Sequence, residues 1–178
     1  DGFQGTPKTL TLYNTNSGIA SPDKAYAPAG IKVNFTLTKN ADGTAVLVEY
    51  LEGGAICTTK YDADGKIIEK ITVFKDGSYI KDGFVPKLIE GEGQTYDGTA
   101  GLVFVSDDDI VNFKYVTVNG EEIDPAYYIV EAGSIKVTLP IELLSILPNG
   151  TYTVGIVSTH GTVTANFHIG IPETGVSM

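Results

Sequence analysis

The feature that most constrains this chain is a regular series of tight-turn signals between short runs of β-forming residues. In residues 31–81 the turns fall at Asp42-Gly43, Gly53-Gly54, Asp64-Gly65 and Asp76-Gly77. They separate five runs that predict strands, at residues 31–39, 44–51, 55–61, 66–74 and 78–81. Glycine supplies the positive φ of tight hairpins, and short connections force neighbouring strands to pair antiparallel. We therefore expect a β-meander whose strands lie in sequence order.

Alternation along these runs predicts that one face of the meander is buried. Val33, Phe35 and Leu37 alternate with polar residues, and the next run repeats the pattern with Val46, Val48 and Tyr50. Such a sheet must cover its apolar face. Two earlier segments are available as the cover, the run at residues 9–13 and the loop through Tyr26 and Pro28.

A second module is predicted beyond residues 82–87, where a Gly and a Pro discourage continuation of a central strand. Residues 1–87 carry 10 Lys against 10 acidic residues, and residues 88–178 carry 2 Lys against 12. The net charges are therefore 0 and −10, and such a shift in composition marks a domain boundary. Short runs at 101–105, 114–118, 127–130, 134–139, 152–158 and 163–169, with a helical turn at 140–147, predict a β-sandwich.

Several motifs of the second module are those of a known group of modules. They are the segments 90–96, 103–107 with Phe113, 116–120, 123–128, 133–139, 143–147 and 149–154. On these motifs the module resembles the immunoglobulin-like X-type modules of clostridial and gut Firmicute exoproteins. The resemblance implies an immunoglobulin-like β-sandwich, no catalytic residues, and service as a spacer or a weak binder of polysaccharide or cell wall. The expected organisation is all-β, with an antiparallel β module at 1–87, an immunoglobulin-like sandwich at 88–170 and a tail at 171–178.

The tail carries a second resemblance. Its residues Ile171, Pro172, Glu173, Thr174 and Gly175 are similar to a sortase sorting signal, in which the Thr–Gly bond is cut. The similarity implies an extracellular, wall-attached Gram-positive protein. No apolar run is long enough to predict a membrane span.

Composition excludes several classes of partner and chemistry. All 12 basic residues are lysines and the formal charge is −10, which argues against nucleic acids and anionic membranes as partners. The single cysteine, Cys57, excludes an internal disulfide. The two histidines, His160 and His168, are both predicted to be solvated, and no nucleophile elbow or phosphate-binding loop is present. We therefore expect that the protein is not an enzyme.

Two sets of residues remain as candidate ligand sites. The run Asp107, Asp108 and Asp109 offers grouped carboxylates, which calcium prefers, and calcium is the one cofactor to consider. The tyrosines Tyr96, Tyr115, Tyr127 and Tyr128 could stack on sugar rings. Because neighbouring strand residues point in opposite directions, only one of Tyr127 and Tyr128 can face water.

The function predicted from the sequence is that of a non-catalytic extracellular module, a spacer or adhesion element displayed on the cell wall. The alternative is a carbohydrate-binding module accessory to a glycosidase or another enzyme in a larger secreted polypeptide. The partners expected are cell-wall or polysaccharide glycans, or a host surface protein.

Overall fold

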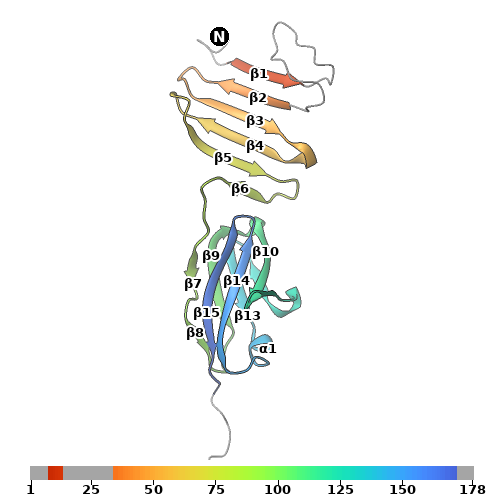
Figure 1. Cartoon of the computed structure of the whole chain (residues 1–178), viewed down its shortest axis with the longest axis vertical. Helices are drawn as coiled ribbons and strands as arrows, with labels where there is room; N and C mark the ends of the chain where they lie inside the picture. Colours follow the sequence, from red (N-terminus) through yellow and green to blue (C-terminus); the bar gives the residue numbers. More distant parts are fainter. Residues whose placement is uncertain (1–7, 14–33, 172–178) are drawn as a thin grey trace, which may run out of the picture. The chain divides into compact units, whose positions relative to one another are not determined.

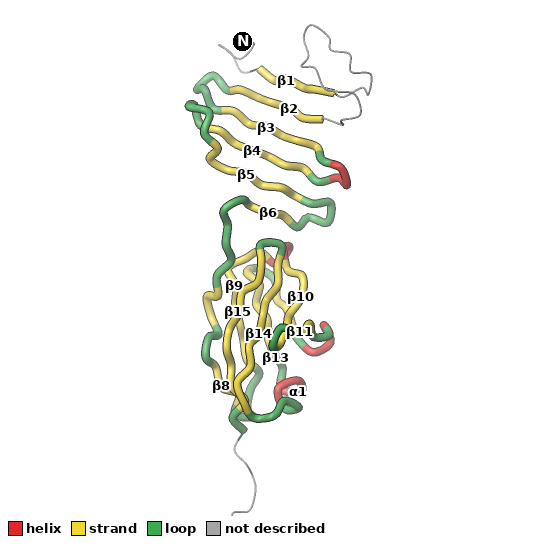
Figure 2. The backbone as a smooth tube through the Cα atoms, viewed as in Figure 1, coloured by secondary structure: helices red, strands yellow, loops and turns green. Residues whose placement is uncertain are grey.

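A computed structural model describes residues 8–13 and 34–171 of the chain. The chain divides into two compact units, residues 1–83 and residues 84–178. Almost all regular structure is strand, and the few helical turns lie in connections (Figures 1 and 2). The chain is therefore all-β, as predicted.

The first unit is one antiparallel sheet in the order β1-β2-β3-β4-β5-β6 (Figure 1). Its strands are β1 (Lys8–Tyr13), β2 (Asn34–Lys39), β3 (Ala45–Tyr50), β4 (Ile56–Tyr61), β5 (Ile67–Val73) and β6 (Tyr79–Lys81), with a 3-10 turn η1 (Glu52–Gly54) before β4. Spatial order equals sequence order, which confirms the predicted meander. The run at residues 9–13 belongs to strand β1, which pairs edge to edge with β2. Of the two candidate covers, this run is therefore excluded, and the other, the loop through Tyr26 and Pro28, lies outside the described residues.

Four successive hairpins of this sheet, from β2 to β6, share one five-residue connection. In each, the first residue donates its N–H to the carbonyl of the fifth, and the fourth donates to the carbonyl of the first. The fourth residue has a positive φ and is a glycine in every case: Gly43, Gly54, Gly65 and Gly77. A left-handed residue at this place matches the strand twist, and glycine adopts it without strain. The recurring Gly signals in the sequence are therefore the cause of the meander.

The register of these hairpins contradicts the predicted single buried face. Phe35 pairs with Glu49, whereas Val48 pairs with Thr36. Paired residues share a face, so Phe35 and Leu37 of β2 point to one side of the sheet, whereas Val46, Val48 and Tyr50 of β3 point to the other. Val33, also expected on the buried face, lies outside the described residues.

The second unit is a sandwich of two sheets, in the orders β12-β13-β9-β7 and β11-β10-β14-β15-β8. Its strands are β7 (Leu88–Glu90), β8 (Gln94–Tyr96), β9 (Leu102–Asp109), β10 (Phe113–Val118), β11 (Glu121–Glu122), β12 (Ile129–Glu131), β13 (Ser134–Leu139), β14 (Gly150–Ser158) and β15 (Gly161–Ile169). The connections include η2 (Ile110–Asn112), η3 (Pro125–Tyr127) and a short helix α1 (Ile141–Leu144).

This strand order is that of an immunoglobulin-like domain. The first strand is split between the sheets, because β7 pairs with β9 whereas β8 pairs in parallel with the last strand, β15. The crossing point is Gly91, where φ is +115° and an added Cβ would lie 2.7 Å from the carbonyl oxygen of Val103. A further immunoglobulin-like feature is the hydroxyl of Tyr152 at the start of β14, which donates to the carbonyl of Pro148 at 2.8 Å and forms a tyrosine corner. The predicted immunoglobulin-like sandwich is confirmed.

The second unit has a continuous hydrophobic core between its sheets. Inward-facing residues of β9, β13 and β15 alternate with more exposed ones, as period-two patterning requires. Phe167 is fully buried, stacks on Tyr152 and packs against Phe104. The predicted helical turn is present as α1, and Leu143 and Leu144 are buried in this core.

Candidate functional site

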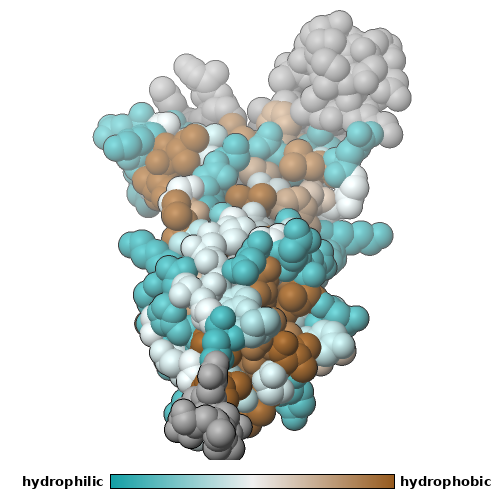
Figure 3. All heavy atoms as spheres, turned by 60° about the horizontal axis from the view of Figure 1, so that its bottom comes forward, coloured by the Kyte–Doolittle hydropathy of each residue, from teal (hydrophilic) through white to brown (hydrophobic). Residues whose placement is uncertain are grey.

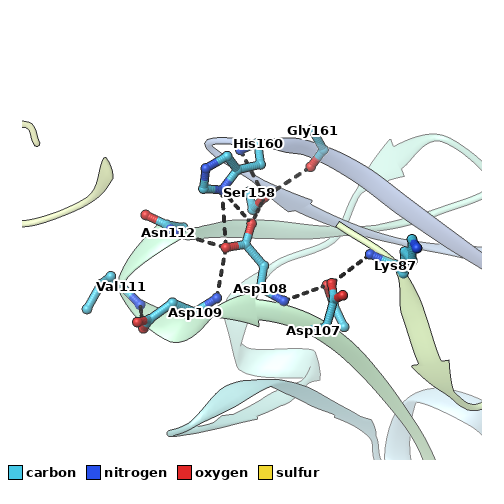
Figure 4. Close-up of polar contacts among 10 residues, drawn as sticks. Lys87, Asp107, Asp108, Asp109, Val111, Asn112, Ser158, His160 and Gly161 are labelled. Carbon is cyan, nitrogen blue, oxygen red and sulfur yellow. Dashed lines mark hydrogen bonds and ion pairs between the residues drawn. The ribbon is translucent and has the colours of Figure 1, made fainter. Parts of the chain in front are cut away.

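The most extensive polar cluster among the described residues lies where the end of β9 meets the turn between β14 and β15 (Figure 4). Along β9, the inward positions are Leu102, Phe104, Ser106 and Asp108. Asp108 is therefore an acidic residue at a core position, and its side chain is 1% exposed. Burying a charge is costly unless it is paired and hydrogen-bonded, so its partners decide what the cluster does.

The carboxylate of Asp108 accepts hydrogen bonds from several surrounding groups. Its Oδ1 accepts from the side-chain amide of Asn112 at 2.9 Å and from the backbone N–H of Asp109 at 2.8 Å. Its Oδ2 accepts from the Ser158 hydroxyl at 2.6 Å and lies 3.0 Å from Nδ1 of His160. Burial raises the pKa of Asp108, but the bonds from Ser158, Asn112, His160 and Asp109 outweigh burial and hold this pKa below its ordinary value. Asp108 is therefore a buried carboxylate at neutral pH.

His160 was expected to be solvated, and that expectation was wrong. Its side chain is 2% exposed, with Nδ1 on Asp108 and its ring 4.8 Å from that of Phe84 in an edge-to-face arrangement. A carboxylate can only accept, so Nδ1 donates in this contact. The other histidine, His168, is exposed as predicted and lies 2.8 Å from the Thr151 hydroxyl.

The cluster contains Ser, His and Asp, but their order in space is not that of a hydrolytic triad. A triad places the imidazole between the serine and the carboxylate, so that the imidazole takes the hydroxyl proton. Here the carboxylate is in the middle, and Ser158 donates directly to it. The Ser158 hydroxyl is therefore fixed by a carboxylate and is not activated as a nucleophile by an imidazole. The hydrogen bonds of the cluster connect the β14–β15 turn to the end of β9.

The three consecutive aspartates do not converge on one point. Asp107 is exposed and accepts from the N–H of Lys87 at 2.7 Å, and Asp109 is exposed and caps η2 through the N–H of Val111. Between them, Asp108 points into the core. In residues 34–171, no three His, Cys, Asp or Glu side chains are grouped to hold a metal ion. Alternation along the strand turns Asp108 away from Asp107 and Asp109, and these two accept from different backbone N–H groups, those of Lys87 and Val111.

Other acidic residues are used in turns. Asp42 and Asp76 each accept from the hydroxyl and the N–H of a residue two positions later, Thr44 and Ser78 respectively. These hydrogen bonds, first those of the hydroxyls, lower the pKa of both aspartates. Their role is local, because each carboxylate stabilises its own hairpin.

The four candidate tyrosines have different surroundings. Tyr96 and Tyr128 are buried, at 2% and 8% exposure, and burial raises the pKa of Tyr128. Neither ring has an exposed face, which contradicts their prediction as sugar-stacking residues. Tyr115 is half-buried, and Tyr127 is 48% exposed. One of the neighbours Tyr127 and Tyr128 faces water, and it is Tyr127, although the two residues lie at the end of η3 and not in a strand.

A hollow that the sequence did not reveal lies on one face of the first sheet. Its volume is about 580 Å³, and it lies over β2 and β3 beside the turns that precede β3 and β5. Phe35, Leu47 and Tyr61 supply apolar lining, and Glu49, Asp62 and Asp64 supply carboxylates. We call this side of the sheet the Phe35 face. The hollow could have been predicted only from the strand register, because the register places Phe35, Leu47 and Tyr61 on the same side of the sheet.

Of the sortase-like motif, Ile171 is described and accepts a hydrogen bond from Asn149 at its carbonyl. Pro172, Glu173, Thr174 and Gly175 lie outside the described residues. None of the helices in residues 34–171 has the length and apolar character of a membrane span.

Comparison with known proteins gives few relatives. No family model matches the chain, and no curated protein matches it. Among solved structures, the chain is similar to a tandem of titin Ig domains, with 14% sequence identity and a TM-score of 0.33, over 93% of this chain and 81% of that one. The assignment of the second unit to the immunoglobulin-like fold rests on its strand pairing.

Proposed function

We propose that this chain is a non-catalytic module of an extracellular, wall-attached protein, in which it acts as a spacer and adhesion element. The observation that carries the proposal is the Asp108 cluster. It is the site in the described residues where Ser, His and Asp side chains meet, and its hydrogen bonds hold a hairpin in place. An immunoglobulin-like sandwich whose buried polar groups are used in this way is suited to a mechanical or display role.

The resemblances found in the sequence support the same proposal. The second unit has the immunoglobulin-like fold that the resemblance to X-type modules implies. The residues Ile171, Pro172, Glu173, Thr174 and Gly175 are similar to a signal that links proteins to the cell wall. Both point to the surface of a Gram-positive cell.

Wall attachment is tested by intact-mass analysis of native protein released from the wall. The expected C-terminus is Thr174, because sortase cuts between Thr and Gly. Any other C-terminus on the wall-released protein contradicts the attachment. Adhesion is tested by binding of the full chain to immobilised host surface proteins, and a chain that binds none of them has no adhesion role.

One observation favours the alternative of a carbohydrate-binding module, and it is the hollow on the Phe35 face. Apolar rings beside carboxylates are suited to a sugar site, because a ring stacks on the sugar and the carboxylates accept from its hydroxyls. Tyr61 supplies such a ring and Asp62 and Asp64 such acceptors. The candidate sugar-binding surface is therefore the hollow of the first unit, and not the four tyrosines of the second unit.

A pull-down on insoluble polysaccharides separates the two functions. A spacer does not bind, whereas a carbohydrate-binding module binds and loses this binding in Tyr61→Ala. The matched control is Tyr127→Ala, which removes an exposed tyrosine outside the hollow. Equal loss in both variants contradicts binding at the hollow.

A further inference from the structure

The chain between the two units is short. Strand β6 is the last strand of the first unit and β7 is the first strand of the second, and a loop joins them (Figure 2). Boundaries between domains usually fall in exposed, flexible linkers that few contacts cross. The contacts of residues 82–87 show where each unit ends and how much chain is left between the two.

The first unit holds the chain as far as Asp82. Lys81 is the last residue of β6 and pairs with Ile71 of β5. One residue further, the N–H of Asp82 donates to the carbonyl of Lys70 at 2.9 Å. This hydrogen bond continues the pairing of β5 with β6, so the backbone of Asp82 is still fixed to the first sheet.

The second unit holds the chain from Phe84 onward. The Phe84 ring lies edge-to-face on the His160 ring, with an interplanar angle of 73°. The imidazole is itself fixed, because it is buried and its Nδ1 lies 3.0 Å from the Asp108 carboxylate. Further along, the N–H of Lys87 donates to the carboxylate of Asp107, and the carbonyl of Lys87 accepts from the N–H of Asp107 at 3.0 Å. The buried cluster thereby holds the ring against which the entering chain packs.

Gly83 lies between these two attachments. Its φ is +81°, which glycine adopts without strain. Apart from its chain neighbours, no described residue has an atom within 4 Å of the position that a Cβ would take at Gly83. We propose that Gly83 is a one-residue hinge between the two units, and that Phe84 is the anchor that confines the hinge to this residue. The units then rotate about the two backbone dihedral angles of Gly83, as is usual for hinges of a few residues.

The Phe84 ring decides how long the free junction is. Without it, the free chain would extend over residues 83–86, because Lys87 is the next residue with a hydrogen bond to the second unit. The ends of a flexible linker of n residues are separated by roughly 5–6 Å × √n, so each released residue adds freedom to the junction. A one-residue hinge allows rotation but almost no separation. This inference goes beyond the proposed function, because it concerns the connection of the units and not what they bind.

Backbone amide relaxation, measured by NMR on the full chain, tests the proposal. A rigid backbone has an order parameter of about 0.85, and a flexible one has a value below about 0.6. In the unmodified chain we expect rigid values at Asp82, Phe84 and Lys87. Phe84→Ala should lower the order parameters of residues 84 and 85 to below about 0.6, whereas Val85→Ala should leave them unchanged. Val85 is the matched control, because it is 70% exposed, as apolar side chains are elsewhere on the surface of each unit (Figure 3).

Flexible values throughout residues 82–87 of the unmodified chain overturn the proposal, as does an equal loss of order in Phe84→Ala and Val85→Ala. A second variant leaves both units unaltered and inserts Gly-Ser-Gly-Ser between Gly83 and Phe84. Each unit should then tumble more independently, so the rotational correlation times should fall below those of the unmodified chain. Equal correlation times in the two chains would show that the junction is already free, and would overturn the one-residue hinge. These measurements contain no glycan, no partner and no cell wall, so their failure leaves the proposed function unaffected.

Discussion

Replacing Asp108 by alanine is expected to destabilise the second unit more than any change at a neighbouring acidic residue. The substitution leaves the donors on Ser158, Asn112, His160 and Asp109 without their common acceptor. A hydrogen bond to a charged group contributes about 1.5–3 kcal/mol, but the four share one acceptor and do not add. Each buried donor left without an acceptor costs about 1–3 kcal/mol, and because the four costs do not add in full we expect about 3–5 kcal/mol for Asp108→Ala.

Two further variants isolate the cause. Asp108→Asn keeps the size of the side chain and one carbonyl acceptor, so its expected cost is about 1–3 kcal/mol. Asp107→Ala removes the neighbouring carboxylate, which is exposed and accepts from one backbone N–H, and should change the stability by less than about 1 kcal/mol. Equilibrium unfolding in urea, with hydrogen exchange of peptides from β14 and β15, measures all three. Equal costs for Asp107→Ala and Asp108→Ala would refute the reasoning.

The same cluster predicts a pH dependence. The pKa of Asp108 is lowered in the folded chain, so the folded state binds its proton less readily than the unfolded state. The stabilisation is therefore complete above the unfolded pKa of about 3.9 and is lost as the pH falls through the folded pKa. The difference in unfolding free energy between the unmodified chain and Asp108→Asn should shrink below about pH 4. A difference that is constant down to acid pH would show that the carboxylate charge does not matter.

Three other results are expected. Phe167→Ala, at a fully buried position, should cost about 3–5 kcal/mol in chemical unfolding, and a negligible shift of the midpoint would remove Phe167 from the core. Gly91→Ala should destabilise the second unit more than Gly93→Ala. Both glycines have a positive φ, but only at Gly91 would the new Cβ clash with the backbone of Val103 and with the Phe104 side chain. Equal midpoints of the two variants in thermal unfolding would contradict this. Calorimetry with millimolar calcium should show no binding heat, because Asp108 points into the core, away from Asp107 and Asp109. A heat that Asp107→Asn abolishes would restore the metal site.

Much of the first unit was predictable because its structure is determined locally. The strands and their order follow from the glycine turns, and each predicted run lies within a few residues of a strand. The face of the side chains in β2 and β3 was predicted wrongly, because it depends on the register. With the five-residue connection, Lys39 pairs with Ala45 and Leu37 with Leu47, so odd positions pair with odd positions. The apolar residues of β2 are odd and Val46 and Val48 are even, so they could not share a side.

In the second unit, the strands with long alternating runs and the short strand β12 were predicted, whereas the short strands β7, β8 and β11 were missed. Strands β7 and β8 have three residues each, and it is the close approach of Gly91 to Phe104 that divides them. The burial of Asp108 has a signal in the sequence, because it continues the inward positions of Leu102, Phe104 and Ser106. Its partners Ser158 and His160 lie about fifty residues away, however, and local patterns carry no information about such a contact.

The repeated connection of the first sheet also determines how such a sheet can change its length in evolution. A segment of two strands and two turns is a complete structural unit, because the same loop geometry precedes and follows it. Duplication or loss of such a segment leaves the direction and the register of all remaining strands unchanged. Each event alters the width of the sheet by about 10 Å, the space of two strands. Related proteins would therefore differ in reach by whole hairpins, and the ends of the sheet would stay the same.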